Sequence, residues 1–376
     1  MKNLVVTLLV LLSSYFLSYS QKEYFKWYFG NQAAMDFVPG APVNITTSAM
    51  VMTYCSASIS DSLGNLLFYS NANQIWNRNN QVMPNGSGIN GNISGGQPAV
   101  IVRKPGSSNF YYLFTNDGFG GPDGLRYTLV DMNLNGGLGD VVTSQKNILL
   151  IASASEQVIA AKDANGHDAW LIAHPFNSGA FNVYHITSAG INTTPVVTTI
   201  GAYRGGAQDA ATGQITIDST YHRIAMAHYL ANAFELYDFN NSTGVISNLL
   251  TFTGYTLPWG IEFSPDGSKL YMAGWTTQYV DQFDLSTYTQ AAINASVVTL
   301  GNVTGPGGPY YTGYMQRAPD GKIYIAVYLD EFLAVINSPN LSGLAANLVD
   351  NGYDLGTVTS QAGLPDKVVV TPYCDV

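Results

Sequence analysis

A repeated strand–turn–strand unit is the feature that most limits what this chain can fold into. Its clearest copies are 261–273, Ile-Glu-Phe-Ser-Pro-Asp-Gly-Ser-Lys-Leu-Tyr-Met-Ala, and 315–326, Met-Gln-Arg-Ala-Pro-Asp-Gly-Lys-Ile-Tyr-Ile-Ala. Pro presets φ and Gly accepts a positive φ, so Pro-Asp-Gly favours a tight turn. The flanking β-branched and aromatic residues are typical of strands. A further strand is expected after each copy, at 280–285 and 332–336.

Weaker copies of the unit precede these two. The six turns are centred on residues 64, 106, 166, 221, 267 and 321, and Gly is absent only near Thr220-Tyr221. Four-stranded propeller blades repeat at roughly 40–50 residues, with insertions placed in loops. The leftover ends, 23–37 and 358–370, would complete a seventh blade and so remove an open sheet edge. The sequence therefore predicts an all-β, seven-bladed β-propeller of four-stranded antiparallel blades, closed by the two ends. A pair of β-sandwiches explains the regular turns less well.

The N-terminus predicts export. Lys2 precedes an apolar run from Leu4 to Leu12, and Ser18-Tyr19-Ser20 allows cleavage before Gln21. The run is shorter than the ~20 residues that a transmembrane helix needs. We therefore expect a signal peptide at 1–20, a single propeller domain at 21–376, no transmembrane segment in the mature chain, and a secreted or cell-surface location.

Composition limits the partners. Charged residues make up 11% of the chain, against about 25% in an ordinary soluble domain. The 15 basic and 25 acidic residues give a net charge of −10 without a basic cluster, which argues against nucleic acid as a partner. Cys55 and Cys374 would form a disulfide in an oxidising compartment, or remain as two buried thiols.

Several stretches resemble secreted proteins of gliding, Bacteroidetes-type bacteria that carry an N-terminal YVTN-like propeller and use a type IX secretion route. The matching stretches are Trp27-Tyr28-Phe29-Gly30-Asn31, Ala57-Ser58-Ile59-Ser60-Asp61, 64–69, 75–79, 81–86, 134–140, 262–267, 349–352 and 360–365. The resemblance covers nearly all of the mature chain and implies the propeller fold and export, but no shared activity.

Candidate functional residues come from the loops on one face of the predicted propeller. His174 and His228 follow the second strands of successive blades, where they could bind a metal or act as acid and base. Trp259, Trp275, Tyr311 and Tyr328 are aromatic and stand among polar or charged neighbours, a combination that suits a carbohydrate or peptide ligand. The ligand-face candidates are Asn116, Asp117, His174, Arg204, His228, Trp259, Glu262, Trp275, Tyr311 and Tyr328.

For each candidate the structural alternative is blade packing or a local hydrogen bond. Glu262, Gln316 and Lys162 fall on inner strands and would line the central channel. Asp131, Asn133 and Asn135 match the start of a Ca²⁺ loop, but position twelve is Val142 in place of Glu, so an Asn/Gly turn is the alternative. The sequence otherwise calls for no cofactor.

No catalytic motif names a reaction. We therefore expect a non-catalytic binding, adhesion or scaffold module with an extracellular protein or carbohydrate partner, acting as a monomer or as part of a surface assembly. The alternative is a propeller-type hydrolase or lactonase with a divalent metal or a histidine at the channel mouth.

Overall fold

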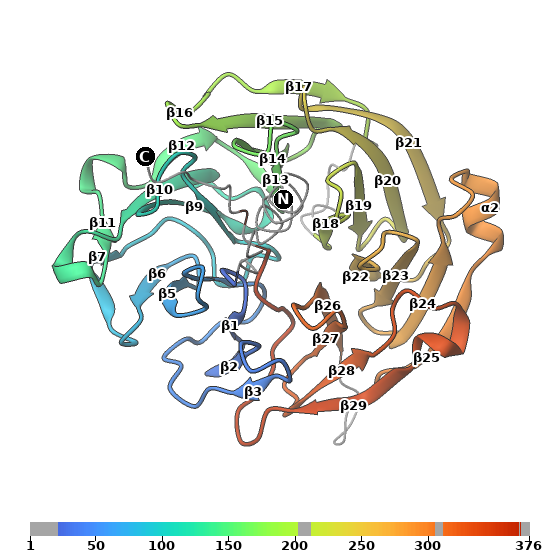
Figure 1. The fold of residues 1–376 in the computed structure, drawn as a ribbon. Helices are drawn as coiled ribbons and strands as arrows, with labels where there is room; N and C mark the ends of the chain where they lie inside the picture. Colours follow the sequence, from blue (N-terminus) through green and yellow to red (C-terminus); the bar gives the residue numbers. More distant parts are fainter. Residues whose placement is uncertain (1–21, 202–211, 305–310, 368, 370–376) are drawn as a thin grey trace, which may run out of the picture.

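The computed structural model describes residues 22–201, 212–304, 311–367 and 369. Within these ranges, seven antiparallel sheets are arranged as blades around a central channel (Figure 1). The predicted seven-bladed propeller is therefore confirmed. The predicted signal peptide lies outside the described residues. In the part of the chain that the structure covers, no helix is both long enough and apolar enough to cross a bilayer.

One blade has three strands, β1 (Lys26–Phe29), β2 (Ala33–Asp36) and β3 (Val43–Asn44). In the other six blades the strands follow one another in chain order, starting from the inner strand. Their strands are β4 (Ala57–Ser60), β5 (Leu66–Ser70), β6 (Gln74–Asn77) and β7 (Val82–Ser87); β8 (Ala99–Arg103), β9 (Phe110–Asn116), β10 (Leu125–Asp131), β11 (Asp140–Val141) and β12 (Ile148–Ile151); β13 (Ala154–Lys162), β14 (Ala169–Pro175), β15 (Ala180–Thr187), β16 (Gly190–Ile191) and β17 (Val196–Thr199); β18 (Ile215–Ile217), β19 (Arg223–His228), β20 (Ala233–Asn240) and β21 (Val245–Thr253); β22 (Pro258–Phe263), β23 (Lys269–Gly274), β24 (Tyr279–Asp284) and β25 (Val298–Asn302); β26 (Thr312–Arg317), β27 (Ile323–Val327), β28 (Phe332–Ile336) and β29 (Leu348–Asp354).

Two blades depart from the expected four strands because their outer strand is divided. β11 and β12 both pair with β10, and β16 and β17 both pair with β15. The described helices are short and lie in connections: α2 (Gln290–Ala295), η1 (Gly118–Gly120), η2 (Asn135–Gly137), η3 (Thr143–Gln145) and η5 (Gly343–Ala346).

All six predicted turns join the first and second strands of a blade. Gly64, Gly106, Gly166, Gly267 and Gly321 each have a positive φ. In the copy that lacks Gly, Tyr221 takes the left-handed conformation with a φ of 59°. The same turn geometry therefore recurs in six of the seven blades, and a non-Gly residue can adopt it at a modest cost in strain.

The two ends of the chain meet in the three-stranded blade. Residues 359–366, here called the closing segment, start at a backbone hydrogen bond from Asn31 N to Thr359 O of 3.0 Å. The segment then runs between the inner strands of the two neighbouring blades. Its backbone bonds tie Tyr314 N to Ala362 O and Asp366 N to Ser56 O. The closing segment thus takes the inner-strand position of the blade that the N-terminal strands begin.

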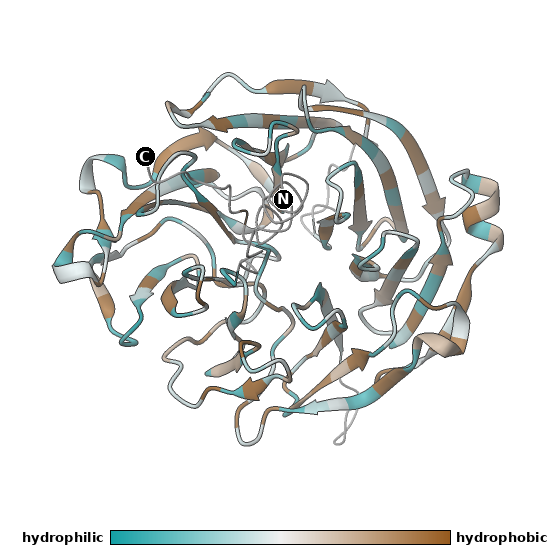
Figure 2. Ribbon diagram, viewed as in Figure 1, coloured by the Kyte–Doolittle hydropathy of each residue, from teal (hydrophilic) through white to brown (hydrophobic). Residues whose placement is uncertain are grey.

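The hydrophobic core lies between the blades. Apolar and polar residues alternate along strands such as β20, and each blade packs apolar side chains against a neighbour (Figure 2). One cluster joins β1 and β2 to β27, β28 and the closing segment through Trp27, Phe37, Tyr324 and Leu364, all of them buried. This packing fixes the inner strands, whose ends carry the candidate site.

Candidate functional site

The channel has two mouths with different chemistry. The inner strands begin at one end of the channel, where the loops between blades arrive, and we call this end the loop-side mouth. They finish at the other end, at the repeated turns, and we call it the turn-side mouth. A cavity of about 210 Å³ lies at the loop-side mouth and one of about 320 Å³ at the turn-side mouth.

Aromatic rings surround the loop-side mouth. Trp275 stacks on Tyr311 with ring centroids 4.8 Å apart and planes 2° apart, and it lies 4.7 Å from Trp259. Trp259 stacks in turn on Tyr314 at 5.3 Å. Tyr54, Tyr229 and Tyr328 extend the same cluster. Tyr311 is 39% exposed whereas Trp259 is buried, so the cluster runs from solvent into the channel.

Of the predicted residues, the structure brings Trp259, Trp275, Tyr311 and Tyr328 together at this mouth. Trp259 stands at the start of β22, and Trp275 and Tyr328 follow the second strands of their blades. Equivalent positions in neighbouring blades meet at one end of the channel, which is why these residues converge.

Polar groups lie beneath the rings. Glu156 is buried, lines the 210 Å³ cavity and accepts hydrogen bonds from Gly96 N at 2.7 Å and Phe119 N at 3.1 Å. Among the described residues, Trp259 Nε1 and the Tyr314 hydroxyl are buried donors with no hydrogen-bond partner. Burial raises the pKa of Tyr314, and nearby Cys55 and Glu156 raise it further, so its hydroxyl stays protonated. The cavity wall therefore includes one carboxylate, from Glu156, and one indole N–H donor, from Trp259.

Buried amides cross the channel between the two mouths. Gln214 accepts from Ile261 N at 2.9 Å and Met315 N at 3.0 Å, and donates to Met315 O at 2.6 Å. Gln97 accepts from Ile215 N at 2.7 Å and donates to Asp366 at 2.8 Å. These side chains join inner strands of different blades and separate the two cavities.

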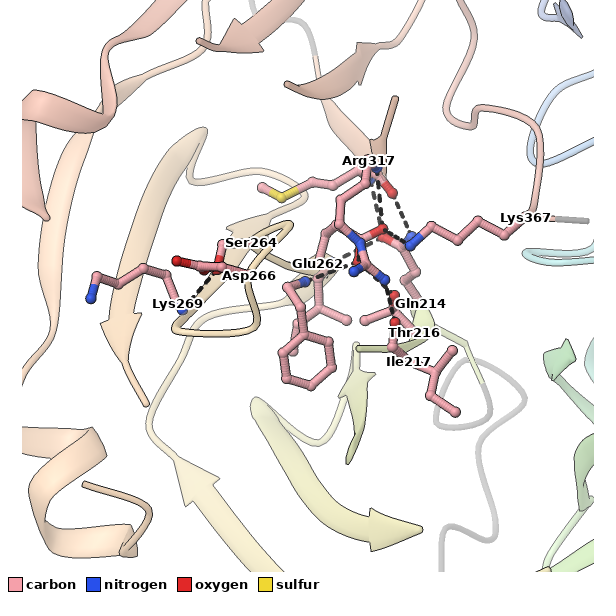
Figure 3. A network of polar contacts seen from close by, with 12 residues as sticks. Gln214, Thr216, Ile217, Glu262, Ser264, Asp266, Lys269, Arg317 and Lys367 are labelled. Carbon is pink, nitrogen blue, oxygen red and sulfur yellow. Dashed lines mark hydrogen bonds and ion pairs between the residues drawn. The ribbon is translucent and has the colours of Figure 1, made fainter. Parts of the chain in front are cut away.

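Glu262 lies at the turn-side mouth, and this corrects the prediction that grouped it with the loop-side candidates. Its carboxylate is fully buried, with Oε1 2.9 Å from Arg317 Nε and Oε2 3.6 Å from Lys367 Nζ (Figure 3). Thr216 Oγ1 donates to Oε1 at 2.8 Å. The reason is positional: Glu262 is the penultimate residue of β22, next to the repeated turn rather than the loop.

The other two inner-strand candidates are also buried or half-buried. Gln316 on β26 is buried, so its side chain does not line a water-filled channel. Lys162 ends β13 near the ion pair between Arg103 and Glu23, whose charged atoms are 3.5 Å apart. Burial lowers the pKa of Lys162.

The two histidines do not line either described cavity. His228 is buried on β19, with Nε2 2.8 Å from Glu235 Oε2, and the Tyr237 hydroxyl donates to the same oxygen at 2.6 Å. His174 is buried at the end of β14, where its ring packs edge-on against Phe181. Both lie between blades, because second-strand side chains point into blade interfaces. Among the described residues, no three His, Cys, Asp or Glu side chains are placed to hold a metal ion.

The remaining candidates have local partners. The side chain of buried Asn116 donates to Ser155 O. Asp117 accepts from Asn92 and from Asp123 N. Asp131 accepts from both the backbone and side-chain nitrogens of Asn133. Asn135 has a φ of 51° and starts η2. These bonds are those of an Asx turn, the alternative given above, and calcium binding there stays a prediction.

Two predicted residues, Arg204 and Cys374, lie outside the described residues. Cys55 is buried beside Trp259 and Tyr314, and burial raises the pKa of its thiol. The pairing of Cys55 with Cys374 stays a prediction.

Sequence reasoning missed Glu156, Arg317 and Lys367. Glu156 and Arg317 carried one usable signal, since each is a charged residue within an inner strand that is otherwise largely apolar or uncharged. Lys367 carried none, because it follows the closing segment and belongs to no repeat.

Comparison with known proteins bears on the fold. No protein-family model and no curated protein matches this sequence. A structure from Bacteroides fragilis, described as a 6-phosphogluconolactonase candidate, is similar over 92% of this chain and 98% of its own, at 13% identity and a TM-score of 0.51. A similarly described structure from Bacteroides uniformis covers 90% of this chain and 84% of its own, at 13% identity and a TM-score of 0.48. At this identity the likeness to the Bacteroides fragilis structure shows the propeller fold and no more.

Proposed function

We propose that this chain is a binding module whose loop-side mouth holds one sugar ring or a ring derived from a sugar, such as a lactone. The observation that carries the proposal is the stacked Trp275–Tyr311 pair at the rim of a cavity that has a buried carboxylate in its wall. Aromatic faces cover the apolar face of a ring, while fixed polar groups orient its hydroxyls.

The size of the cavity favours a small ligand. Sites for drug-sized molecules occupy roughly 300–1,000 Å³, and this cavity has about 210 Å³. The polar groups fit hydroxyl-rich chemistry, because the Glu156 carboxylate can accept a hydrogen bond from a ligand and the unpartnered Trp259 Nε1 can donate one. A purely apolar ligand would leave that donor without a partner, at a cost of about 1–3 kcal/mol.

The first prediction concerns the stacked pair. Trp275→Ala or Tyr311→Ala should weaken sugar binding about thirty-fold, because an aromatic residue at the centre of a binding site contributes about 2 kcal/mol. The measurement is calorimetry against a panel of monosaccharides and δ-gluconolactone. Tyr279→Ala is the matched control, since Tyr279 is 50% exposed on β24 and is not part of the aromatic cluster. If no panel member binds the wild type, or if the control loses as much affinity, the proposal is wrong.

Lactone hydrolysis is a second candidate, favoured by the position of Glu156. A buried carboxylate in the wall of the cavity can take a proton from a water molecule that attacks the lactone carbonyl, and the ring then opens to a hydroxy acid. The Bacteroides fragilis structure with this fold is described as a lactonase candidate, which supports testing this chemistry. This mechanism does not require His174 or His228, which lie between blades and not at the mouth.

Glu156→Gln separates the two candidates. If Glu156 is the general base, the variant should lose at least about 100-fold in kcat for δ-gluconolactone while it still binds the ring. Hydrolysis is followed by a pH indicator against the spontaneous rate. Trp275→Ala should instead raise KM. A wild-type rate equal to the spontaneous rate would show that the lactonase proposal is wrong, and it would not affect the proposal of a binding module.

We further infer that the module works outside the cell. The apolar run behind Lys2, the low charge content and the resemblance to exported propellers support this placement. The ligand would then be an extracellular carbohydrate or a sugar carried by another surface molecule.

A further inference from the structure

The turn-side mouth holds a second cavity that the proposed function does not use. It has about 320 Å³ and apolar walls that include Tyr24, Tyr221, Pro265 and Pro319. Two cationic side chains, Arg317 and Lys367, also line it. The buried amides of Gln97 and Gln214 separate it from the aromatic mouth.

The two cations share one carboxylate. Arg317 Nε and Lys367 Nζ lie 2.9 Å and 3.6 Å from different oxygens of Glu262 (Figure 3). Glu262 is fully buried, and Lys367 is mostly buried, with 23% of its side chain exposed, and it lines the cavity. A guanidinium keeps its proton in proteins, whereas a buried ammonium readily gives one up.

The surroundings of Lys367 shift the pKa of its amine in both directions. Burial lowers its pKa to about 7, and the charge of Arg317 on β26 also lowers it. The negative charges of Glu262 on β22 and Asp218 after β18 raise the pKa of Lys367. An ordinary lysine is almost entirely protonated at neutral pH. A large fraction of Lys367 side chains therefore carry a free lone pair at neutral pH.

We propose that Lys367 is a covalent attachment site for aldehydes or ketones with a small apolar or aromatic body. The neutral amine attacks the carbonyl carbon, a C–N bond forms, the carbonyl electron pair moves to oxygen, and one proton passes from the nitrogen to that oxygen. The hydroxyl of this carbinolamine takes one proton from solvent and leaves as water while the nitrogen lone pair forms the C=N bond, which gives a protonated imine. One water is released, and no oxidant or reductant is needed. Glu262, next to the nitrogen, stabilises the protonated imine.

The apolar walls favour this ligand class. Tyr24 and Tyr221 offer ring surfaces to the body of the carbonyl compound, and the two prolines add apolar surface without a hydrogen-bond donor. The protonated imine carries the same positive charge as a lysine ammonium, so Glu262 can pair with the product as it pairs with the protonated amine.

The test traps the imine in the full chain. The protein is incubated with benzaldehyde and cyanoborohydride at pH 7, and modified lysines are identified by peptide mass spectrometry. We expect Lys367 to be modified at least ten times faster than Lys322, a partly exposed lysine in a neighbouring repeated turn. The rate at Lys367 should rise with pH and level off above about pH 8, because the amine is by then mostly neutral.

Variants identify the residue and separate the two sites. Lys367→Met should abolish the fast adduct, and Lys322→Met should leave it unchanged. Trp275→Ala, which tests the aromatic mouth, should not alter it. Equal rates at Lys367 and Lys322 in the folded wild type would overturn the proposal, and so would a rate at Lys367 that is still climbing near pH 10. Both readings come from the wild type, so neither depends on a variant folding.

Discussion

Glu262→Gln should destabilise the protein by about 3–5 kcal/mol, the cost of removing one partner from a buried ion pair. The substitution keeps the shape of the side chain but leaves Arg317 and Lys367 facing each other without a carboxylate. It also replaces an acceptor of three further hydrogen bonds, from Thr216 Oγ1, Phe263 N and Arg317 N. Unfolding in urea, followed by far-UV circular dichroism, measures the loss.

Two comparisons distinguish this mechanism from a general effect of charge removal. Adding Lys367→Met to Glu262→Gln should recover part of the lost stability, because the mostly buried amine that has lost its carboxylate partner is then gone. Lys26→Gln should cost no more than about 1 kcal/mol, since the Lys26–Asp36 pair is partly exposed although its atoms are only 2.6 Å apart. A Glu262→Gln loss as small as that of Lys26→Gln would contradict the account.

Trp27→Ala should cost a similar amount, about 3–5 kcal/mol, through the blade that closes the ring. Trp27 is fully buried, and its ring lies 4.9 Å from Phe37 and 5.8 Å from Tyr324. Losing the indole leaves a cavity where the N-terminal strands, the last four-stranded blade and Leu364 of the closing segment meet. The urea midpoint should fall, and the amides of Tyr314 and Asp366 should exchange their hydrogens faster.

Leu344→Ala is the matched control. Leu344 is 76% exposed in η5, so its truncation should change stability by less than about 0.5 kcal/mol. If Trp27→Ala lowers stability while exchange at Tyr314 and Asp366 stays at the wild-type rate, the closing blade does not open as described.

The architecture was predictable because six blades repeat one local turn and the two leftover ends remained to form the seventh. The six turns have the required backbone conformation, including the one at Tyr221 where Gly is missing. The divided outer strands of two blades were not predictable, because they depend on which segments reach the edge of β10 or β15 after the blade has formed. The inner strand of each of these six blades directly precedes a repeated turn in the chain, so its position could be predicted from that turn.

The candidate site was predictable in part. Trp259, Trp275, Tyr311 and Tyr328 could be placed on one face because their positions relative to the turns repeat. The direction of a single side chain follows no such rule. Glu262 was placed at the wrong mouth because one or two residues along an inner strand decide which end a side chain reaches. Lys367 meets Glu262 across the channel, a contact between segments that share no pattern in the sequence.

The closing segment also determines when the molecule can finish folding. The Tyr24 hydroxyl bonds to Pro365 O, a contact between residues 341 positions apart. Contacts of such long sequence separation form slowly, because loop closure must be achieved before they contribute energy. Until residues 359–366 are available, the N-terminal strands have no inner neighbour, and the ring stays open with exposed strand edges. A chain that is synthesised from the N-terminus therefore cannot complete its fold until nearly all of it has been made. This delay fits the export proposed above, which would move the chain while it is still unfolded, and it leaves an incomplete chain with a strand edge that is prone to aggregate.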